Sequence, residues 1–583
     1  MPSEFLRRHL DAETLVESLR RRESDLDRTA FVLEALGEAP DVVSAGRLLT
    51  EAERFARGLR ALGADRGDRI LLILPTSTEF VFSYWGTLLA AATPVPAYPP
   101  AGLAQLGSFA RTLRGMITAC KAPLLVVPDL LRDVLADAGE VLPEGARLVT
   151  PEDVRAAASD ATPLPSPPKG TDLALIQFSS GSTGDPKGIC LTHANILANV
   201  TAFLSRMDVT EDDGCVTWLP LYHDMGLIGT MLGPMMIAAP LALIPPTDFL
   251  RRPSFWLESL GRNRATISVA PQFAFNLCLR KIKPEDLPHV DLSRLRVLLN
   301  GAEPIHVDGV RAFEERFAPI GLRRGVVTPC YGLAEGTLAA AMLVPGSAVE
   351  AHEPEGVATE KSATTATDGS ARASAVSVGP AMDGVEIRIR GADGAWVGDG
   401  IVGEICLRGP SICRGLLGAD GERPSTDAEG WLATRDLGFL KAAALHVTGR
   451  IKDLIILGGR NLYPQDLEAV ASELPGFRPG RVAAFGVSVA ERATEALVVV
   501  AETTEEDSAL VPGHVTELRR QLRERFGVIP WDTVLLKRGH LPLTTSGKLR
   551  RAKTREDYEA GALREVVYRA RSGRAATAGS ALD

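Results

Sequence analysis

A short segment rich in glycine, serine and threonine has the residue types of an anion-binding loop. Residues 179–188 read Ser-Ser-Gly-Ser-Thr-Gly-Asp-Pro-Lys-Gly and follow an apolar run at 173–178 that predicts a strand. Such a loop offers backbone N–H groups, hydroxyl donors and glycines with unusual dihedral angles, which wrapping a phosphate requires. Lys187 adds a cation, and the Walker A pattern GxxxxGK[ST] occurs nowhere in the sequence. A flexible turn without a ligand is the alternative interpretation.

Further motifs accompany this loop in one consistent order. They are QFSSGSTGDPKGICLTHAN (177–195), LPLYHDMG (219–226), NGAEP (300–304), YGLAEGT (331–337), TRDLGF (434–439) and LPLTTSGKLRR (541–551). On these motifs most of the chain resembles the adenylate-forming enzymes, the superfamily of acyl-CoA synthetases, peptide-synthetase adenylation domains and luciferases. In enzymes that look like this, ATP and a carboxylic acid first give an acyl-adenylate and pyrophosphate. The resemblance therefore implies ATP as the cofactor.

The resemblance also assigns the phosphate and adenine contacts. The residues expected to cradle the β- and γ-phosphates are Ser179, Ser180, Gly181, Ser182, Thr183, Gly184 and Lys187, with Thr183 among the catalytic residues. Glu335, which alone would be read as a surface carboxylate, is expected to hold Mg²⁺, a hard ion that prefers oxygen ligands. The residues expected around the α-phosphate and the adenine are Tyr331, Gly332, Thr337, Asn300, Gly301, Ala302 and Glu303.

Four more residues take roles by resemblance. Asp436 is expected to accept hydrogen bonds from the ribose hydroxyls, and Arg450 to lie near the ribose or the phosphates. Lys548 is the main catalytic candidate, because an ammonium group on a Ser-Gly turn can stabilise the charge that develops during adenylation. His223 is expected to act as an aromatic gate at the acyl-carboxylate site, and a buried structural histidine is the alternative.

The order of elements around these motifs predicts an α/β protein. Apolar runs at 70–74, 124–127, 173–178, 216–219, 266–269 and 295–299 alternate with amphipathic segments of helical length, which is typical of parallel sheets covered by helices. After about residue 376, closely spaced runs predict an antiparallel, β-barrel-like subdomain. We expect a large N-terminal domain, residues 1–450, and a small mobile α+β domain, residues 451–583, that carries Lys548. Residues 345–375 contain few apolar side chains and predict a mobile insertion.

Within the superfamily, the sequence looks most like fatty acyl-AMP ligases. The similar details are HDMGLIG (223–229), AYPP (97–100), Gln177, GRNLYPQDLE (459–468) and the insertion after Thr337. The resemblance implies a fatty acid as substrate and, as acceptor of the acyl group, the phosphopantetheine thiol of an acyl carrier protein acting in trans. An acyl-CoA synthetase that uses CoA is the alternative, and an inactive lipid-binding protein is a further one.

The tunnel and docking surfaces are harder to read from the sequence. Met225, Ile228, Phe273 and Phe275 are candidates for the wall of the acyl tunnel. The arginines Arg519, Arg520, Arg523 and Arg525 could dock an acidic carrier protein, although a solvated helix face is the favoured interpretation.

The composition excludes some classes of protein. The 583 residues carry 64 Lys and Arg against 73 Asp and Glu, a net charge of −9, which argues against a nucleic-acid partner. The uncharged stretch 226–246 contains four prolines, so we expect a buried helix at about 225–237 and a strand at 241–244, with no membrane span. Seven scattered cysteines without metal-binding spacing, and no apparent signal peptide, favour a cytoplasmic location.

Overall fold

The computed structural model describes residues 3–571 except 98, 100–105, 138–141, 144, 180–186, 358–373, 458–459, 490–494, 508 and 544–548, together with 577–578. The chain divides into two compact units. The first contains Met1–Glu350, Val378–Ile387 and Cys406–Ala433, and the second contains Ala351–Ser377, Arg388–Ile405 and Thr434–Asp583. The expected domains 1–450 and 451–583 stay a prediction. Over the described ranges, no helix is both long and apolar enough to pass through a bilayer.

The first unit is built on an eight-stranded sheet. In sheet order its strands are β14 (Ala339–Met342), β13 (Val327–Gly332), β12 (Val297–Asn300), β11 (Ile267–Ala270), β9 (Cys215–Thr217), β10 (Leu241–Leu243), β1 (Thr29–Leu33) and β2 (Asp41–Ser44). The strands from β13 to β1 pair in parallel, and only β14 and β2 pair antiparallel, at the two edges. The central strands are buried apolar runs, as parallel strands covered on both faces must be.

Two smaller sheets complete the first unit. The parallel sheet contains β4 (Thr93–Pro96), β3 (Arg69–Leu72), β5 (Leu124–Val126) and β6 (Arg147–Val149). The antiparallel sheet contains β21 (Gly421–Arg423), β20 (Gly415–Gly418), β8 (Lys187–Thr192) and β7 (Leu173–Ser179). The predicted α/β class with parallel-sheet subdomains is therefore confirmed.

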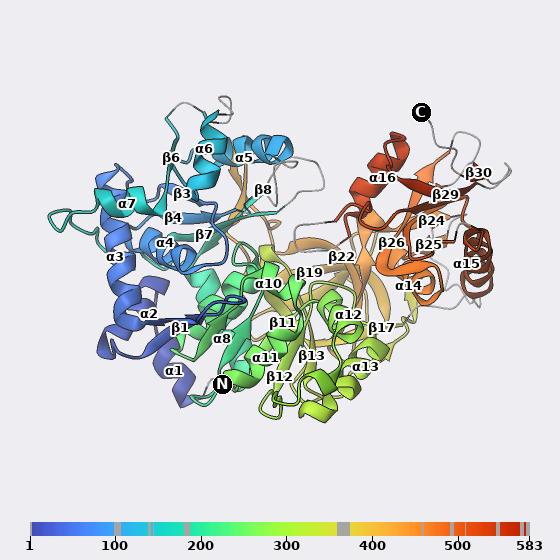
Figure 1. The fold of residues 1–583 in the computed structure, drawn as a ribbon, viewed down its shortest axis with the longest axis horizontal. Coiled ribbons are helices and arrows are strands. Elements are labelled where there is room, and N and C mark those ends of the chain that lie inside the picture. Colours follow the sequence, from blue (N-terminus) through green and yellow to red (C-terminus); the bar gives the residue numbers. More distant parts are fainter. Residues whose placement is uncertain are drawn as a thin grey trace. The chain divides into compact units, whose positions relative to one another are not determined.

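Helices cover these sheets, and Figure 1 shows α11, α12 and α13 beside the strands β11–β13. The longer helices of this unit are α3 (Ala45–Ala61), α4 (Thr78–Leu89), α5 (Leu106–Cys120), α6 (Asp129–Asp137), α8 (His193–Arg206), α11 (Ser254–Arg262), α12 (Gln272–Lys281) and α13 (Val307–Phe317). The shorter ones are α1 (Glu4–Leu10), α2 (Leu15–Arg20), α7 (Pro151–Ala157), α9 (Gly233–Met236) and α10 (Pro246–Arg251). The uncharged stretch forms a π-helix, Met225–Leu232, that continues into α9 and is followed by β10, close to the expected helix and strand.

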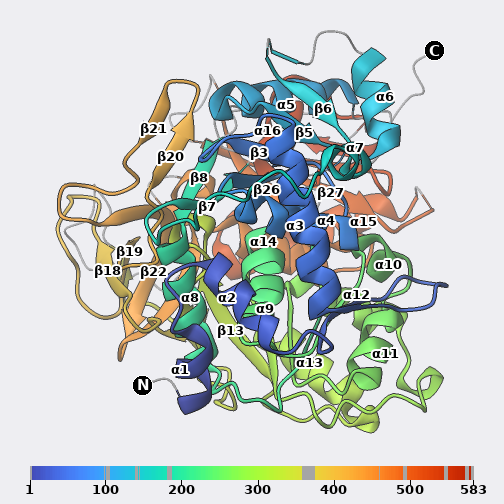
Figure 2. The same cartoon turned by 90° about the vertical axis from the view of Figure 1, so that its left-hand side faces the viewer.

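Helices α3 and α4 lie side by side and pack closely (Figure 2). Gly86 of α4 makes this approach possible, because a Cβ atom there would lie 2.8 Å from the carbonyl oxygen of Ala52 and 2.7 Å from Cβ of Phe55. The pair belongs to the main apolar core, which includes the fully buried Trp85 and Phe80.

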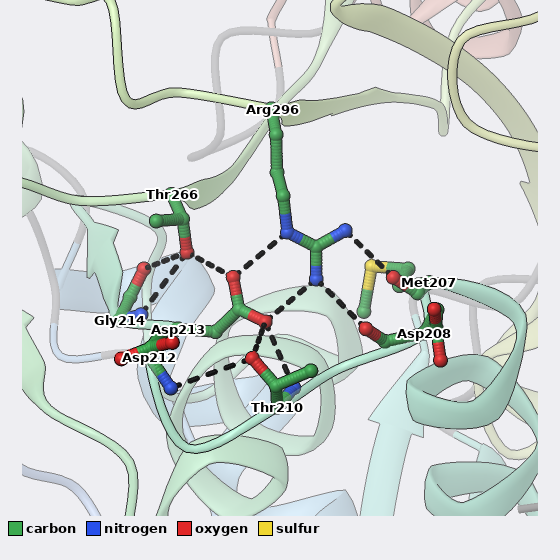
Figure 3. Close-up of polar contacts among 8 residues, drawn as sticks. All are labelled: Met207, Asp208, Thr210, Asp212, Asp213, Gly214, Thr266 and Arg296. Carbon is green, nitrogen blue, oxygen red and sulfur yellow. Dashed lines mark hydrogen bonds and ion pairs between the residues drawn. The ribbon is translucent and has the colours of Figure 1, made fainter. Parts of the chain in front are cut away.

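A polar network fixes the amino ends of three neighbouring strands of the large sheet (Figure 3). Thr266 directly precedes β11, and Arg296 directly precedes β12. Asp213 lies two residues before the start of β9. Arg296 donates to both carboxylate oxygens of Asp213, with Nε–Oδ1 2.8 Å and Nη2–Oδ2 2.7 Å, and the Thr266 hydroxyl donates to Oδ1 at 2.5 Å. Arg296 also donates to the carbonyl oxygen of Met207 at 2.7 Å. This network stabilises the sheet at the edge where its strands begin.

The second unit contains most of a seven-stranded, mainly antiparallel sheet. Its strands are β15 (Ala351–His352), β17 (Ala375–Pro380), β23 (Ala444–Arg450), β22 (Leu432–Lys441), β19 (Ile401–Arg408) and β16 (Gly356–Val357), with β18 (Glu386–Arg390) also paired to β19. The antiparallel texture expected after residue 376 is confirmed by the pairing of β22 with β23.

The C-terminal part of the second unit has an α+β fold. A five-stranded sheet contains β26 (Phe477–Ser488), β27 (Glu495–Thr503), β28 (Asp532–Leu536), β29 (Val566–Arg571) and β30 (Thr577–Ala578), and β24 (Ile455–Leu457) pairs with β25 (Arg460–Leu462). The helices are α14 (Pro464–Glu473), α15 (Val511–Phe526) and α16 (Arg551–Glu559). Leu467 of α14 and Leu518 of α15 share one apolar core with Val499 of β27.

The expectation that residues 345–375 form no packed element is wrong for their described part. Strand β15 pairs antiparallel with β17, and β16 pairs parallel with β19. Val349 packs against the main core, and Pro354 is buried. The sequence pattern missed these strands because each is only two residues long. Residues 358–373 lie outside the described residues.

Candidate active site

The predicted site segments of the first unit follow the carboxyl ends of adjacent strands. Residues 219–226 come after β9, residues 271–273 after β11, residues 300–303 at the end of β12, and residues 333–337 after β13. Because these strands are parallel, their carboxyl ends lie at one edge of the sheet. Ligands of α/β proteins bind at that edge. The Asp213 network lies at the opposite, amino edge.

Thr337 occupies a strained position in the YGLAEGT segment. Its dihedral angles, φ 72° and ψ −60°, are those of a classic γ-turn, which is rare and strained for a residue with a branched side chain. The fully buried hydroxyl of Thr337 donates to the carbonyl oxygen of Ser411 at 2.5 Å. The carbonyl oxygen of Glu335 accepts from the N–H of Cys413 at 2.8 Å. Residues 411–413 therefore hold this segment in place.

Two asparagines of α8 support the same region. Asn195 and Thr192 form a capping box at the start of α8, and Nδ2 of Asn195 also donates to the carbonyl oxygens of Pro410 and Ile412 at 2.7 and 2.9 Å. The buried Asn199 donates to the carbonyl oxygen of Ala339 at 2.8 Å and accepts from its N–H at 3.0 Å. The LTHAN part of the signature thus positions other segments. Asn199 belongs to none of the motifs. The only hint of its role in the sequence is a polar amide side chain on an otherwise apolar helix face.

The phosphate loop itself is described only at its two ends. Ser180, Gly181, Ser182, Thr183 and Gly184 lie outside the described residues, and of Ser179 only the backbone is described. Ser179 at the end of β7 pairs with Lys187 at the start of β8. Strand β8 in turn pairs with β20, directly after residues 411–413. Lys187 and the Thr337 segment are therefore anchored on the same stretch of chain.

The NGAEP segment closes tightly against β13. A Cβ atom at Gly301 would lie 2.7 Å from Sγ of Cys330, so only glycine fits there, and Ala302 has a φ of 66°. Asn300 is fully buried, and its Nδ2 donates to Oε1 of Gln272 at 2.9 Å. Within the part of the chain that the structure describes, Oδ1 of Asn300 has no hydrogen-bond partner.

The neighbouring YGLAEGT backbone is similarly crowded. Gly332 stands against the carbonyl group of Leu338, where a Cβ atom would clash, and Tyr331 is buried. Both segments thus have closely packed backbone, and their role in framing the adenine stays a prediction.

Glu303 contacts the first turn of α12. Its Oε2 accepts a hydrogen bond from the N–H of Phe273 at 2.8 Å, in the first turn of α12. The side chain thus contacts a helix of the apolar wall, and a role in nucleotide binding stays a prediction.

His223 stands before the π-helix, with about one third of its side chain exposed. Its Nδ1 lies 2.5 Å from Oδ1 of Asp224, which also accepts from the N–H of Met225 at 2.7 Å. Of the tunnel candidates, Ile228 and Phe275 are fully buried and Met225 is nearly so. Phe273 is half-buried and meets Trp218 edge to face, with 5.8 Å between ring centroids. The partly exposed histidine therefore directly precedes a buried apolar helix, and its role as a gate stays a prediction.

The ribose candidates of the second unit are paired with each other. Asp436 of β22 stands opposite Arg450 of β23, and Nε of Arg450 lies 2.8 Å from Oδ1 of Asp436. Asp436 is buried, and its N–H donates to the hydroxyl of Thr434 at 3.1 Å. A carboxylate accepts hydrogen bonds, and binding of the ribose hydroxyls by this pair stays a prediction.

Lys548 lies outside the described residues, but the chain on both sides of it is described. Leu543 bridges to Leu549, and the N–H of Arg550 donates to the carbonyl oxygen of Pro542 at 3.0 Å. The partly buried Arg551 then pairs with Glu468 and Asp453, each at 2.8 Å. The two ends of this segment are thus fixed to the body of the unit.

The residues present fit a Mg²⁺ ion shared with a substrate. No group of three metal-ligating side chains occurs among the residues that the structure describes. Mg²⁺ does not need one, because it usually takes one or two carboxylates and completes its shell with waters and substrate phosphates. The carboxylate of Glu335, on the segment that shares its anchor with Lys187, would be such a ligand, and this role stays a prediction.

The arginines of α15 do not form a free basic surface. Arg520 pairs with Glu517 and Glu524, each at 2.6 Å, and Arg525 pairs with Glu473 at 3.1 Å. Arg519 donates to the carbonyl oxygen of Ala570 at 2.8 Å. These contacts favour the interpretation as a solvated helix face over a docking site.

The chain is similar to a known family and to several known proteins. The family described as AMP-binding enzyme matches residues 20–417. A putative acyl-CoA synthetase of Caulobacter vibrioides is 35% identical over 90% of this chain and 92% of its own. The long-chain-fatty-acid–AMP ligase FadD26 of Mycobacterium marinum is 33% identical over 84% and 87%.

Two further similarities are informative. The medium-chain-fatty-acid–[acyl-carrier-protein] ligase JamA of Moorena producens is 31% identical over 86% of this chain and 87% of its own. A solved structure from a study of fatty acyl-adenylate ligases of E. coli and L. pneumophila has 32% identity and a TM-score of 0.86, covering 95% of this chain and 99% of that chain.

Proposed function

The chain belongs to the AMP-binding enzymes and is an ATP-dependent, AMP-forming ligase, and from this premise we propose that it is a fatty acyl-AMP ligase serving an acyl carrier protein. It activates a fatty acid with ATP to the acyl-adenylate and pyrophosphate, and passes the acyl group to a phosphopantetheine thiol in trans. The main support is the likeness, over nearly the whole chain, to ligases named for fatty acids.

The first step needs a carboxylate held in line with the α-phosphorus while the phosphate charge is neutralised. In the proposed mechanism, Lys187 and the loop before it bind the outer phosphates. Glu335 would hold Mg²⁺, which would supply positive charge to neutralise the phosphates. Lys548 places an ammonium group beside the reacting oxygens, and no step requires a general base.

The remaining contacts orient the two substrates. The backbone around Gly301 and Gly332 frames the adenine, and the paired Asp436 and Arg450 bind the ribose. His223 limits access to the acid carboxylate, and the apolar residues near Ile228 and Phe275 accept the acyl chain. The buried apolar side chains of Ile228 and Phe275 favour a fatty acid.

The carrier protein as acceptor is supported by JamA, whose name includes the acyl carrier protein. The insertion after Thr337 is a further detail in which the sequence looks like fatty acyl-AMP ligases, and its described strands β15 and β16 are paired into the sheet. A second candidate, an acyl-CoA synthetase, is favoured by the relative from Caulobacter vibrioides.

The proposed first step is tested by ATP–pyrophosphate exchange with purified protein. We expect exchange that depends on added fatty acid and stops when Mg²⁺ is chelated. Exchange without any response to fatty acids of different length would contradict the proposed substrate. Absence of exchange would contradict the proposed activity altogether.

A further inference from the structure

We propose that Glu303 is a positioning residue that couples the nucleotide side of the site to the wall of the fatty-acid tunnel. It does so by capping α12 from a distance, and it does not bind the nucleotide. This inference rests on the proposed function, because it concerns how tightly and how selectively the fatty acid binds.

Helix α12 lacks a cap of its own. Its N-cap residue is Pro271, which has no polar side chain, and no capping side chain from its own segment bonds to the first turn. The N–H groups of a first helical turn need acceptors, and a carboxylate there also interacts favourably with the helix dipole. Glu303, 30 residues further along the chain, supplies that acceptor to the N–H of Phe273 at 2.8 Å.

A second link joins the same two segments. Nδ2 of Asn300 donates to Oε1 of Gln272 at 2.9 Å, and Nε2 of Gln272 donates to Oδ1 of Asn276 at 3.3 Å. Asn300 and Gln272 are both buried. The segment expected to frame the adenine is therefore bonded twice to the first turn of α12, through one buried amide and one carboxylate.

The first turn of α12 carries an aromatic ring of the apolar wall. The ring of Phe273 meets Trp218 edge to face at 5.8 Å, and Trp218 stacks on Phe249 with 3.8 Å between centroids and also meets Trp256. Trp218 directly precedes the LPLYHDMG segment that contains His223. A shift of Phe273 would therefore displace the rings packed against it, because aromatic pairs prefer specific geometries.

The two possible roles of Glu303 make opposite kinetic predictions. If it caps α12, its loss loosens the wall, so the KM for the fatty acid rises and discrimination between chain lengths weakens. If it binds the nucleotide, the KM for ATP rises and the chain-length profile stays unchanged. The first turn of α12 lies beside the wall, so we expect the first outcome.

The test is fatty-acid-dependent ATP–pyrophosphate exchange by Glu303→Ala, measured with saturated acids of several lengths. We expect the KM for the acid to rise about tenfold, the size typical of losing a helix cap, while the KM for ATP changes less than about twofold. Glu303→Gln keeps an oxygen acceptor but no charge, so its KM for the acid should lie between those of the wild type and Glu303→Ala. Phe273→Leu should weaken chain-length discrimination in the same way, and the double variant should add little to either change.

Glu314 provides the matched control. Its Oε1 accepts from the N–H of Val327 at 3.1 Å, so it is, like Glu303, a carboxylate bonded to a distant backbone group in the same unit, and it is buried. Glu314→Ala should lower the unfolding midpoint without changing the KM for the acid. If the KM for the acid rose equally in Glu314→Ala, the rise in Glu303→Ala would reflect a general loss of stability, and the proposal would be overturned.

Other outcomes are equally decisive. A rise in the KM for ATP alone, or no change in either KM, would overturn the role of Glu303 while the proposed function stands. If Glu303→Ala does not fold, Glu303→Gln and Phe273→Leu still give both KM values and the length profile. Wild-type protein without exchange on any fatty acid would instead contradict the proposed function.

Discussion

Replacing Thr337 by valine tests how the strained turn of the YGLAEGT segment is held. Valine keeps the shape and the branching of threonine and removes only the hydroxyl. That hydroxyl is fully buried and donates to the carbonyl oxygen of Ser411 at 2.5 Å. Its single hydrogen is therefore already used inside the protein. The strain of φ 72° remains, because valine is β-branched as well.

The size of the effect follows from the burial of both groups. Leaving a buried carbonyl without its partner costs about 1–3 kcal/mol, so the free energy of unfolding should fall by that amount. If the same energy holds Glu335 and Thr337 in the reactive geometry, kcat/KM for adenylation should fall about 5- to 150-fold. Thr337→Ser keeps the donor and should retain most of both quantities.

The assay combines urea unfolding with ATP–pyrophosphate exchange on the same variants. We expect Thr337→Val to lose stability and exchange together, and Thr337→Ser to lose little of either. A Thr337→Val protein of unchanged stability but strongly reduced exchange would refute the reasoning, because the hydroxyl would then act on the substrate directly. Unchanged stability and exchange would refute it as well.

Two further predictions concern other parts of the chain. Arg296→Met leaves the buried Asp213 without its ion-pair partner and should cost about 3–5 kcal/mol in urea unfolding at pH 7. Burial alone would raise the pKa of Asp213, but hydrogen bonds from Arg296, Thr266 and Thr210 outweigh burial and hold that pKa below its usual value. The stability that this site gives the wild-type protein should therefore be lost as the pH falls below about 4, and the difference in unfolding free energy between the two proteins should shrink there. A difference that is independent of pH would contradict this. Lys548→Ala should abolish acyl-adenylate formation with an unchanged unfolding curve, and near wild-type exchange in that variant would refute its catalytic role.

The fold could be predicted from the sequence where long patterns carry the signal. The buried apolar runs of β9, β11 and β12, separated by helical segments, predicted a parallel sheet, and pairing in the structure confirms it. The same runs placed the motif segments at the carboxyl ends of neighbouring strands. Periodicity and motifs are local, and they succeed where the structure is determined locally.

Partners of single side chains could not be predicted in this way. Glu303 bonds a backbone group 30 residues away, and Asn199 supports a strand 140 residues further along the chain, so neither partner can be read from spacing. The strands β15 and β16 are too short to produce a pattern, and they are seen only through their pairing with β17 and β19. These features depend on tertiary contacts, which override local preference.

The most direct test of the central claim is a transfer assay with the purified protein, ATP, Mg²⁺ and a fatty acid. Parallel reactions contain either CoA or a phosphopantetheinylated acyl carrier protein, and mass spectrometry detects the acyl thioester in each. We predict an acyl thioester on the carrier protein in the second reaction and no acyl-CoA in the first. Formation of acyl-CoA without acylation of the carrier protein would contradict the account.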